Sequence, residues 1–215
     1  MQNERGVWNR SKLPTWLRAP RIFPWLGGRL LQRALQNWRI EFCSEPPPFD
    51  SDVEISFIIS ARGMERCANL LTTLQTIAAQ KNVALECIVV EQANERALEA
   101  HLPAWVRYAH TPLPRAEMPF NRAWALNVGA RLARGKLFVF HDTDFLAPCA
   151  YAHELATLCA QGYRAMRLQR FLFFLDDTQT RRVQALPCLE KIDRIAYVLQ
   201  DSCGGTCAVA RETFF

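Results

Sequence analysis

Two aspartates, Asp142 and Asp144, stand one residue apart directly after the short apolar run Leu137–Phe140. Because such a run predicts a buried strand, carboxylates at its end are costly unless a positive group meets them. Alternate residues of an extended chain point the same way, so both side chains could face one cation. Mg2+ and Mn2+ bind carboxylate oxygens together with substrate phosphates. The spacing therefore favours a metal site for a nucleotide diphosphate; the alternative is a turn residue or helix cap before Pro148.

Alternating strand and helix patterns surround the two aspartates. Apolar runs predict strands at 53–60, 85–90, 105–110, 137–141, 163–175 and 206–210. Helical periodicity predicts helices at 65–80, 120–134 and 150–161, the last two closed by Gly135 and Gly162. This order predicts an α/β fold whose central sheet is mostly parallel, with helices on both faces. In such sheets ligands bind outside the carboxyl ends of the strands, which is where the aspartates are expected.

Polar residues also follow the first two expected strands, at the same edge of the sheet. Ala61 and Arg62 follow the first strand, and Glu91 and Gln92 follow the second. A guanidinium at Arg62 could hold a diphosphate or stack near a base. Glu91 could accept hydrogen bonds from a ribose or a base. The alternatives are a surface arginine in a turn and an exposed strand end.

The expected helix at 120–134 carries three further polar candidates. Asn121 is a suitable N-cap, and Arg122 follows it where a helix N-terminus already favours an anion. Asn127 lies in mid-helix, where its intrinsic propensity is unfavourable. Either a ligand role or a buried, hydrogen-bonded amide would explain Asn127.

The order of these motifs resembles that of the β-1,4-galactosyltransferases and the chondroitin-polymerase-type enzymes, within glycosyltransferase families 2 and 7. The resemblance spans about Val53 to Phe215 and rests on Phe120-Asn121-Arg122-Ala123, Leu126-Asn127-Val128-Gly129, Phe138-Val139-Phe140-His141-Asp142-Thr143-Asp144 and Gly204-Gly205-Thr206. It implies a GT-A fold, a UDP-sugar donor and a glycan or other hydroxyl acceptor. It also implies a divalent metal, usually Mn2+ with Mg2+ as the other candidate, and inversion at the anomeric carbon by direct displacement.

The resemblance also implies roles for single residues. Asp144 resembles the metal-binding aspartate and Asp142 its companion on the donor side, so both are expected metal ligands. Arg62 and Arg122 resemble donor-binding arginines, and the glycine pair resembles one that lines the sugar site. Together with the strand-end residues, the expected donor site comprises Ala61, Arg62, Glu91, Gln92, Asn121, Arg122, Asn127, Asp142, Gly204 and Gly205.

The sequence departs from the family pattern after Phe215. Family members continue with a glycine-rich turn and a Trp-Gly-x-Glu-Asp segment, which holds the general base that takes the acceptor proton. Nothing marks a substitute among the upstream candidates Asp176, Asp177, Asp193 and Asp201. We therefore expect a C-terminally short glycosyltransferase domain, with its base beyond Phe215. A nucleotide-sugar-binding remnant without transfer is the second hypothesis. A nucleotidyltransferase is the third, although Ser60-Ala61-Arg62-Gly63 does not resemble the glycine-rich basic loop of that class.

Charge and composition divide the chain at about residue 50. Residues 1–42 hold eight Lys/Arg and two Glu, a net charge of +6, whereas the whole chain carries +5, so the rest sums to −1. We therefore expect a basic amphipathic segment with a proline-rich linker at 1–50, a GT-A-like domain at 51–215, and no nucleic-acid partner. Apolar residues from Arg29 to Phe42 share one helical face. Residues 13–42 could contact an anionic membrane, or this helix could pack on the main domain.

Localisation follows from what the sequence lacks. It shows no apolar stretch of about 18 residues, no secretory signal pattern and no CxxC pair. A cytoplasmic protein is expected, peripheral at the inner face of the membrane if the basic segment binds lipid.

Overall fold

A computed structural model describes residues 2–3, 6–7, 15–16, 24–49, 52–115, 117–200, 202 and 204–215. The chain forms two compact units, one of residues 1–40 and 168–204 and the other of residues 41–167 and 205–215. These units do not coincide with the expected segments 1–50 and 51–215, whose boundary lies outside the described residues. The functional division at residue 50 stays a prediction.

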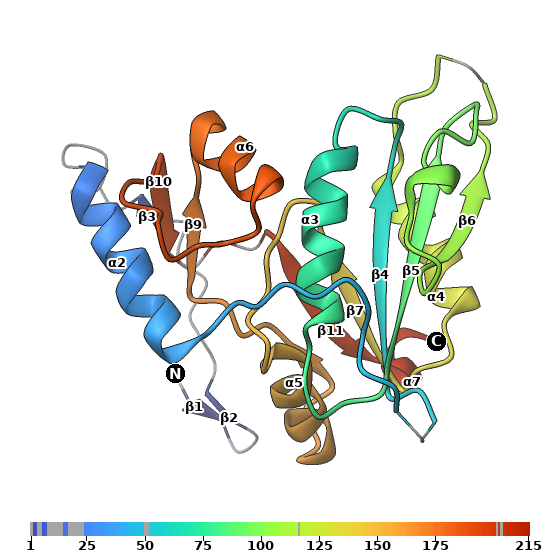
Figure 1. The fold of residues 1–215 in the computed structure, drawn as a ribbon. Coiled ribbons are helices and arrows are strands. Elements are labelled where there is room, and N and C mark those ends of the chain that lie inside the picture. The colour runs from blue at the N-terminus through green and yellow to red at the C-terminus, as the bar shows by residue number, and fades with distance from the viewer. Residues whose placement is uncertain are drawn as a thin grey trace. The chain divides into compact units, whose positions relative to one another are not determined.

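The larger unit is built on a six-stranded sheet (Figure 1). Its strand order is β6 (Arg107–Thr111), β5 (Leu85–Gln92), β4 (Ile55–Ala61), β7 (Leu137–His141), β11 (Thr206–Ala210) and β8 (Ala165–Met166). The first four strands pair in parallel, and β11 runs antiparallel to both β7 and β8. The expected α/β class with a mainly parallel central sheet is confirmed.

Helices cover both faces of this sheet. They are α3 (Cys67–Ala78), α4 (Arg122–Leu132), α5 (Tyr151–Ala160) and the short α7 (Arg211–Phe214), with a 3-10 turn at Glu99–His101. The step from β4 to β5 and the step from β6 to β7 run in opposite directions across the sheet. Right-handed crossovers therefore place α3 and α4 on opposite faces. Because both faces are covered, all seven residues of β4 are buried.

The smaller unit contains α2 (Pro24–Asn37), α6 (Asp177–Ala185) and an antiparallel sheet ordered β3 (Thr15–Trp16), β10 (Tyr197–Gln200) and β9 (Phe171–Phe174). Strands β1 (Gln2–Asn3) and β2 (Gly6–Val7) pair separately. On α2, Leu31 is buried and Gln32 Nε2 donates to the carbonyls of Leu189 and Ile192 at 2.7 and 3.0 Å. A Cβ on Gly28 would lie 1.9 Å from the Asp193 carbonyl oxygen, so only glycine fits this approach.

The helix expected from Arg29 to Phe42 therefore begins earlier and ends at Asn37, and Trp38 is exposed. Its contacts with residues 189–192 support the packing interpretation. Membrane contact through residues 13–42 stays a prediction, and residues 13–14 and 17–23 lie outside the described residues. Among the helices that the structure describes, none has the length and apolarity to cross a membrane.

Three sequence-based element assignments are wrong. The strand expected at 163–175 is two short strands, β8 and β9, which belong to different sheets. Helix α6 and strand β10 were not expected, and Gln179 and Val183 are the buried residues of α6, too few for a clear apolar pattern. Gly135 does not cap α4, because the helix ends at an extended Ala133. Instead, a Cβ on Gly135 would lie 2.8 Å from Ser56 N, so glycine allows the close approach to β4.

Candidate functional site

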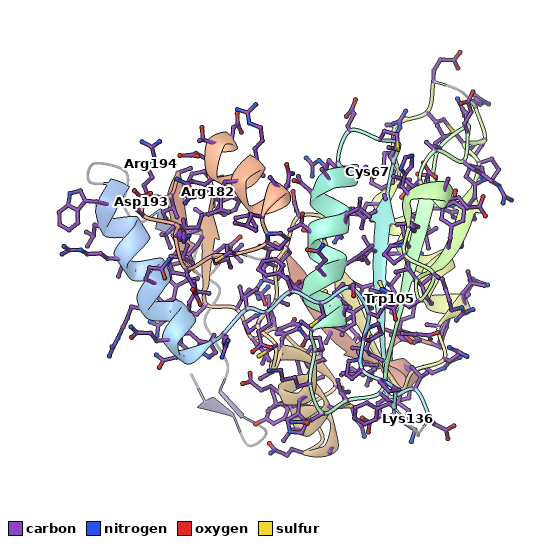
Figure 2. The ribbon with its side chains drawn as sticks, viewed as in Figure 1. Cys67, Trp105, Lys136, Arg182, Asp193 and Arg194 are labelled. Carbon is purple, nitrogen blue, oxygen red and sulfur yellow. The ribbon has the colours of Figure 1, made fainter. Side chains whose placement is uncertain are left out.

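The carboxyl edge of the sheet in the larger unit brings together residues from four segments. Arg62 follows β4, Gln92 ends β5, Asp142 and Asp144 follow β7, and Arg122 begins α4. Strand β11 runs antiparallel to β7, so its first residues also lie at this edge. Figure 2 labels Cys67 at the start of α3, toward this end of the sheet, and Lys136 before β7, toward the opposite end.

Asp142 is held on both carboxylate oxygens. Oδ1 accepts from Arg122 Nη2 at 2.5 Å, and Oδ2 accepts from the backbone N–H of Gly205 at 3.1 Å. The backbone N–H of Asp142 donates in turn to the Gly205 carbonyl at 2.8 Å. Gly205 has φ +94°, and a Cβ there would lie 2.4 Å from the Phe145 ring. The predicted glycine is thus required by its backbone and by its contact with Phe145.

Asp144 is more open than Asp142. Its side chain is 46% exposed, and its Oδ2 accepts from Arg66 Nη1 at 3.2 Å. Thr143 between the two aspartates is buried, and its carbonyl accepts from Thr73 Oγ1. Strand β7 ends at His141, and Thr143 and Asp144 lie in a turn, so the expectation that both carboxylates face one cation stays a prediction. Of the alternatives, the helix cap is wrong, because the N-cap of α5 is Ala150, whereas Asp144 is a turn residue.

Hydrogen bonds fix the start of α4 against the end of β5. Asn121 Oδ1 accepts from Trp124 N at 3.0 Å, which confirms Asn121 as the N-cap. The backbone N–H of Asn121 donates to Gln92 Oε1 at 2.6 Å, and Gln92 is buried. Gln92 thereby places Arg122 near Asp142. Asn127 is exposed, so the buried-amide alternative for that residue is wrong.

Glu91 has a different environment from the one expected. Its side chain is fully buried, so the exposed-strand-end alternative is wrong. Oε2 accepts from Leu98 N at 3.0 Å and from the Tyr108 hydroxyl at 2.7 Å. Burial, together with this hydrogen bond, raises the pKa of Tyr108, so its hydroxyl remains a donor. Among the described residues nothing bonds to the buried Oε1. A direct contact between Glu91 and a donor stays a prediction.

The remaining predicted donor residues are Ala61, Arg62 and Gly204, of which Ala61 pairs with Glu91 in the parallel ladder of β4 and β5. Arg62 is exposed beside Gly63, whose φ is +57°, and Ala61 is buried at the end of β4. Gly204 belongs to the smaller unit, where its carbonyl accepts from Gln169 Nε2 and its N–H donates to Ser202 Oγ. Their donor roles stay predictions.

The sequence analysis included His141 in a motif without assigning it a role, and it did not name Arg66. His141 is fully buried, and its Nε2 and Nδ1 lie 2.9 Å from the Phe145 carbonyl and 3.0 Å from Thr206 Oγ1. Burial lowers the pKa of His141 to about 4, although the Phe145 carbonyl and Asp142 act in the opposite direction. The ring is therefore neutral at neutral pH. The contacts of His141 with Thr206 and of Arg66 with Asp144 join residues 65 and 78 positions apart, so no local pattern predicts them.

The carboxylates fit a divalent cation only as part of its coordination shell. Within the described part of the chain, no group of three or more His, Cys, Asp or Glu side chains could hold a metal ion. Mg2+ and Mn2+ commonly take one or two carboxylates and complete their shell with water and substrate phosphates. Asp142 and Asp144 at an open edge, with two arginines beside them, match that incomplete ligand set.

Comparison with known proteins identifies the relatives of this chain. Residues 56–215 match the family model described as glycosyl transferase family 2. One similar solved structure is a mannosyltransferase from Pyrobaculum calidifontis in complex with GDP-Man and Mn2+. Its TM-score is 0.48 and its sequence identity 18%, and the match covers 90% of this chain and 54% of the mannosyltransferase chain. S. aureus TarS 1-349 has a TM-score of 0.43 and 15% identity over 57% of this chain and 35% of its own. The chain thus spans about a third to a half of these structures. A search of curated proteins found no match.

Proposed function

The chain belongs to glycosyl transferase family 2, and from this premise we propose that it binds a UDP-sugar with a divalent cation at the carboxyl edge of its sheet. We further propose that it transfers the sugar to a glycan or other hydroxyl acceptor, with inversion at the anomeric carbon. Within the family, the motifs around Asp142 favour a galactosyltransferase-like type that serves polysaccharide synthesis.

The observation that carries this proposal is the junction of Arg122, Asp142 and Gly205. Arg122 is the first residue of α4, so its guanidinium and the helix N-terminus present positive charge to the same space. Asp142 holds Arg122 on one oxygen and the Gly205 N–H on the other. A diphosphate would meet the arginine and the helix N-terminus, while a cation would meet the carboxylates.

Asp144, with Asp142, would hold the divalent cation. That cation supplies Lewis-acid stabilisation of the negative charge on the departing nucleoside diphosphate. The protein residues orient the diphosphate: Arg122 and Arg66 lie beside the carboxylates and can form charge-assisted hydrogen bonds to phosphate oxygens. Gly205 keeps side-chain atoms away from the backbone that bonds to Asp142.

Donor binding without transfer is the second candidate function. Two upstream aspartates that could have served as a general base have structural partners in the smaller unit. Asp176 Oδ1 caps α6 by accepting from Gln179 N at 2.8 Å, and Asp193 Oδ1 lies 3.4 Å from Gln179 Nε2. Asp201 lies outside the described residues. Membership of a glycosyltransferase family does not favour the nucleotidyltransferase hypothesis. A cytoplasmic location and membrane contact through residues 13–42 also stay proposals.

Calorimetric titration with UDP, in the presence and absence of Mn2+, tests the donor site. We expect metal-dependent binding that weakens when Asp142 is changed to Asn, because the variant loses the charge that faces both Arg122 and the cation. Absence of metal-dependent binding by the wild type would overturn the proposal. Release of UDP from UDP-galactose, compared with a protein-free Mn2+ control, then separates transfer or hydrolysis from binding alone.

A further inference from the structure

A chain of buried polar side chains lies directly beneath the two aspartates. It consists of Tyr151, Thr206 and His141, which are 4%, 3% and 0% exposed. The Tyr151 hydroxyl lies 3.1 Å from Thr206 Oγ1, which lies 3.0 Å from His141 Nδ1. His141 Nε2 lies 2.9 Å from the Phe145 carbonyl. Buried polar groups at these distances are hydrogen-bonded, so the chain is continuous from α5 to the residue after Asp144.

The direction of each hydrogen bond follows from the last acceptor. The Phe145 carbonyl can only accept, so His141 Nε2 carries the proton and donates. With the proton on Nε2, Nδ1 is the acceptor that faces the Thr206 hydroxyl 3.0 Å away, and the hydroxyl donates to it. Thr206 Oγ1 in turn accepts from the Tyr151 hydroxyl, which burial keeps protonated by raising the pKa of Tyr151. The tautomer of His141 with its proton on Nε2 therefore allows all three hydrogen bonds of the chain to form.

This chain ties the segment Asp142–Phe145 to the sheet at both of its ends. At the first end, Thr206 pairs with His141 across β11 and β7, and the adjacent Gly205 exchanges two hydrogen bonds with Asp142. At the second end, His141 Nε2 holds the Phe145 carbonyl. The ring of Phe145 also packs edge-on against His141, with centroids 5.2 Å apart. Movement of Thr206 would therefore reach both aspartates.

We propose that Thr206 is a positioning residue for the donor site, which acts through His141 and Gly205 to fix the two carboxylates for a cation and a diphosphate. This inference rests on the proposed function of the same site. Thr206 is buried and its hydroxyl is bonded to Tyr151 and His141, so its proposed effect on the donor site is indirect. Outer hydrogen bonds of this kind commonly change metal affinity by about 10- to 100-fold when they are removed.

Two substitutions at Thr206 separate the hydroxyl from the shape of the side chain. Thr206→Val keeps the branched shape but cannot donate to His141, whereas Thr206→Ser keeps the hydroxyl. We expect Thr206→Val to weaken Mn2+-dependent UDP binding by about tenfold in calorimetry at a temperature well below unfolding. We expect Thr206→Ser to bind nearly as the wild type does. In the ligand-free protein, amide hydrogen exchange across residues 142–147 should accelerate in Thr206→Val alone.

Ser56→Ala is the matched control. Ser56 is also fully buried, and its hydroxyl donates to Glu86 Oε1 at 2.8 Å at the opposite end of the sheet. Ser56→Ala should lower the unfolding temperature and leave UDP affinity unchanged. Thr206→Val would give the same result if Thr206 had only a structural role.

Three outcomes in the Thr206 variants overturn the proposal. Unchanged exchange across residues 142–147 in Thr206→Val would show that the buried chain does not hold the segment. Faster exchange with unchanged UDP affinity would show that the held geometry is irrelevant to binding. Equal loss of affinity in Thr206→Val and Thr206→Ser would assign the effect to packing and not to the hydroxyl. If the wild type binds no UDP, the proposed function fails and the positioning role fails with it, while hydrogen exchange still reports on the buried chain.

Discussion

Carboxylates lie at both ends of the same sheet, and the two ends differ in how far these side chains are buried and hydrogen-bonded. At the amino end, Glu86 is 5% exposed and accepts four hydrogen bonds. The donors are Arg134 N at 2.6 Å, Arg107 Nη1 at 2.7 Å, Ser56 Oγ at 2.8 Å and Arg134 Nε at 3.0 Å. At the carboxyl end, the side chains of Asp142 and Asp144 are 32% and 46% exposed, and each pairs with one arginine, while Asp142 also accepts one hydrogen bond from Gly205 N.

The difference indicates which carboxylates can exchange their present partners for a bound ligand. Both oxygens of Glu86 are saturated within the fold, so a cation or phosphate could enter only by breaking buried bonds. The pairs of Asp142 and Asp144 lie partly in water, where an ion pair is worth little and can be exchanged. Residue type and charge are similar at the two ends, whereas burial and saturation are not. The comparison predicts that Glu86 determines stability and that Asp144 determines binding.

The largest expected effect is on stability at the amino end. Glu86→Ala leaves Arg107 and Arg134 without their acceptor and opens a buried space. We expect the free energy of unfolding to fall by about 3 kcal/mol. This value is at the lower end of the range for breaking a buried ion pair, because both guanidinium groups remain partly in water. Urea unfolding measures the change. Glu99→Ala is the control, since Glu99 pairs with Arg96 at 3.4 Å on the surface and should lose less than about 1 kcal/mol. Equal losses in the two variants would contradict the comparison.

The second effect is on binding at the carboxyl end. Asp144→Asn removes a charged ligand oxygen but keeps the shape and exposure of the side chain. We expect Mn2+-dependent UDP affinity to fall by about 10- to 100-fold, or about 1.4 to 2.7 kcal/mol, in calorimetry. The free energy of unfolding should change by less than about 0.5 kcal/mol. Glu99→Gln, which neutralises another exposed carboxylate paired with an arginine, should leave UDP affinity unchanged. A large loss of stability with unchanged affinity in Asp144→Asn would reverse the two roles.

The third effect is the dependence of stability on pH. Burial would raise the pKa of Glu86, but hydrogen bonds from the Arg134 backbone and from Arg107, Ser56 and Arg134 side chains together lower it. The ionised carboxylate therefore stabilises the fold above its ordinary pKa of 4.5 and loses this contribution as pH falls through the lower native pKa. We expect the stability difference between wild type and Glu86→Gln to shrink below pH 4.5 in urea unfolding. A difference that stays constant from pH 7 to pH 3 would contradict this origin.

The sequence predicted the elements that carry strong local patterns. Strands β7 and β11 were predicted with their observed bounds, because each is an apolar run between polar or glycine residues. The family resemblance placed Arg122 and Asp142 in one expected donor site, and the structure joins their side chains by a hydrogen bond. These successes depend on residues within one element or on the family resemblance.

The failures depend on contacts between distant segments. Residues 163–175 form one apolar pattern, yet they divide between two sheets, because strand partners and not local hydrophobicity decide the sheet. For Glu91 the sequence left open a donor contact or an exposed strand end, whereas the structure buries Glu91 and bonds it to Leu98 N and the Tyr108 hydroxyl. Thr206 contacts His141 from 65 residues away, and periodicity within either strand contains no signal of that pairing.

The smallest expected effect tests how exchangeable the carboxyl-end pairs are. Arg66 and Asp144 are 67% and 46% exposed, and an ion pair of this kind is worth about 0.2 to 1 kcal/mol. If Asp144 binds the cation as proposed, Arg66 competes with it for Oδ2 in the absence of nucleotide. Removing Arg66 should then raise Mn2+ affinity by an amount equal to the free energy of the ion pair, which corresponds to about 1.4- to 5-fold.

Electron paramagnetic resonance titration of free Mn2+ with Arg66→Ala, without UDP, measures this competition. Arg96→Ala removes a similar exposed arginine from Glu99 and should leave Mn2+ binding unchanged. A fall in Mn2+ affinity in Arg66→Ala would mean that Arg66 orients Asp144 and does not compete with the cation for it. The geometry of Asp144 would then depend on its ion pair, as that of Glu86 depends on its arginines. A rise confined to Arg66→Ala would instead show that this pair is released on metal binding, which the saturated oxygens of Glu86 do not allow.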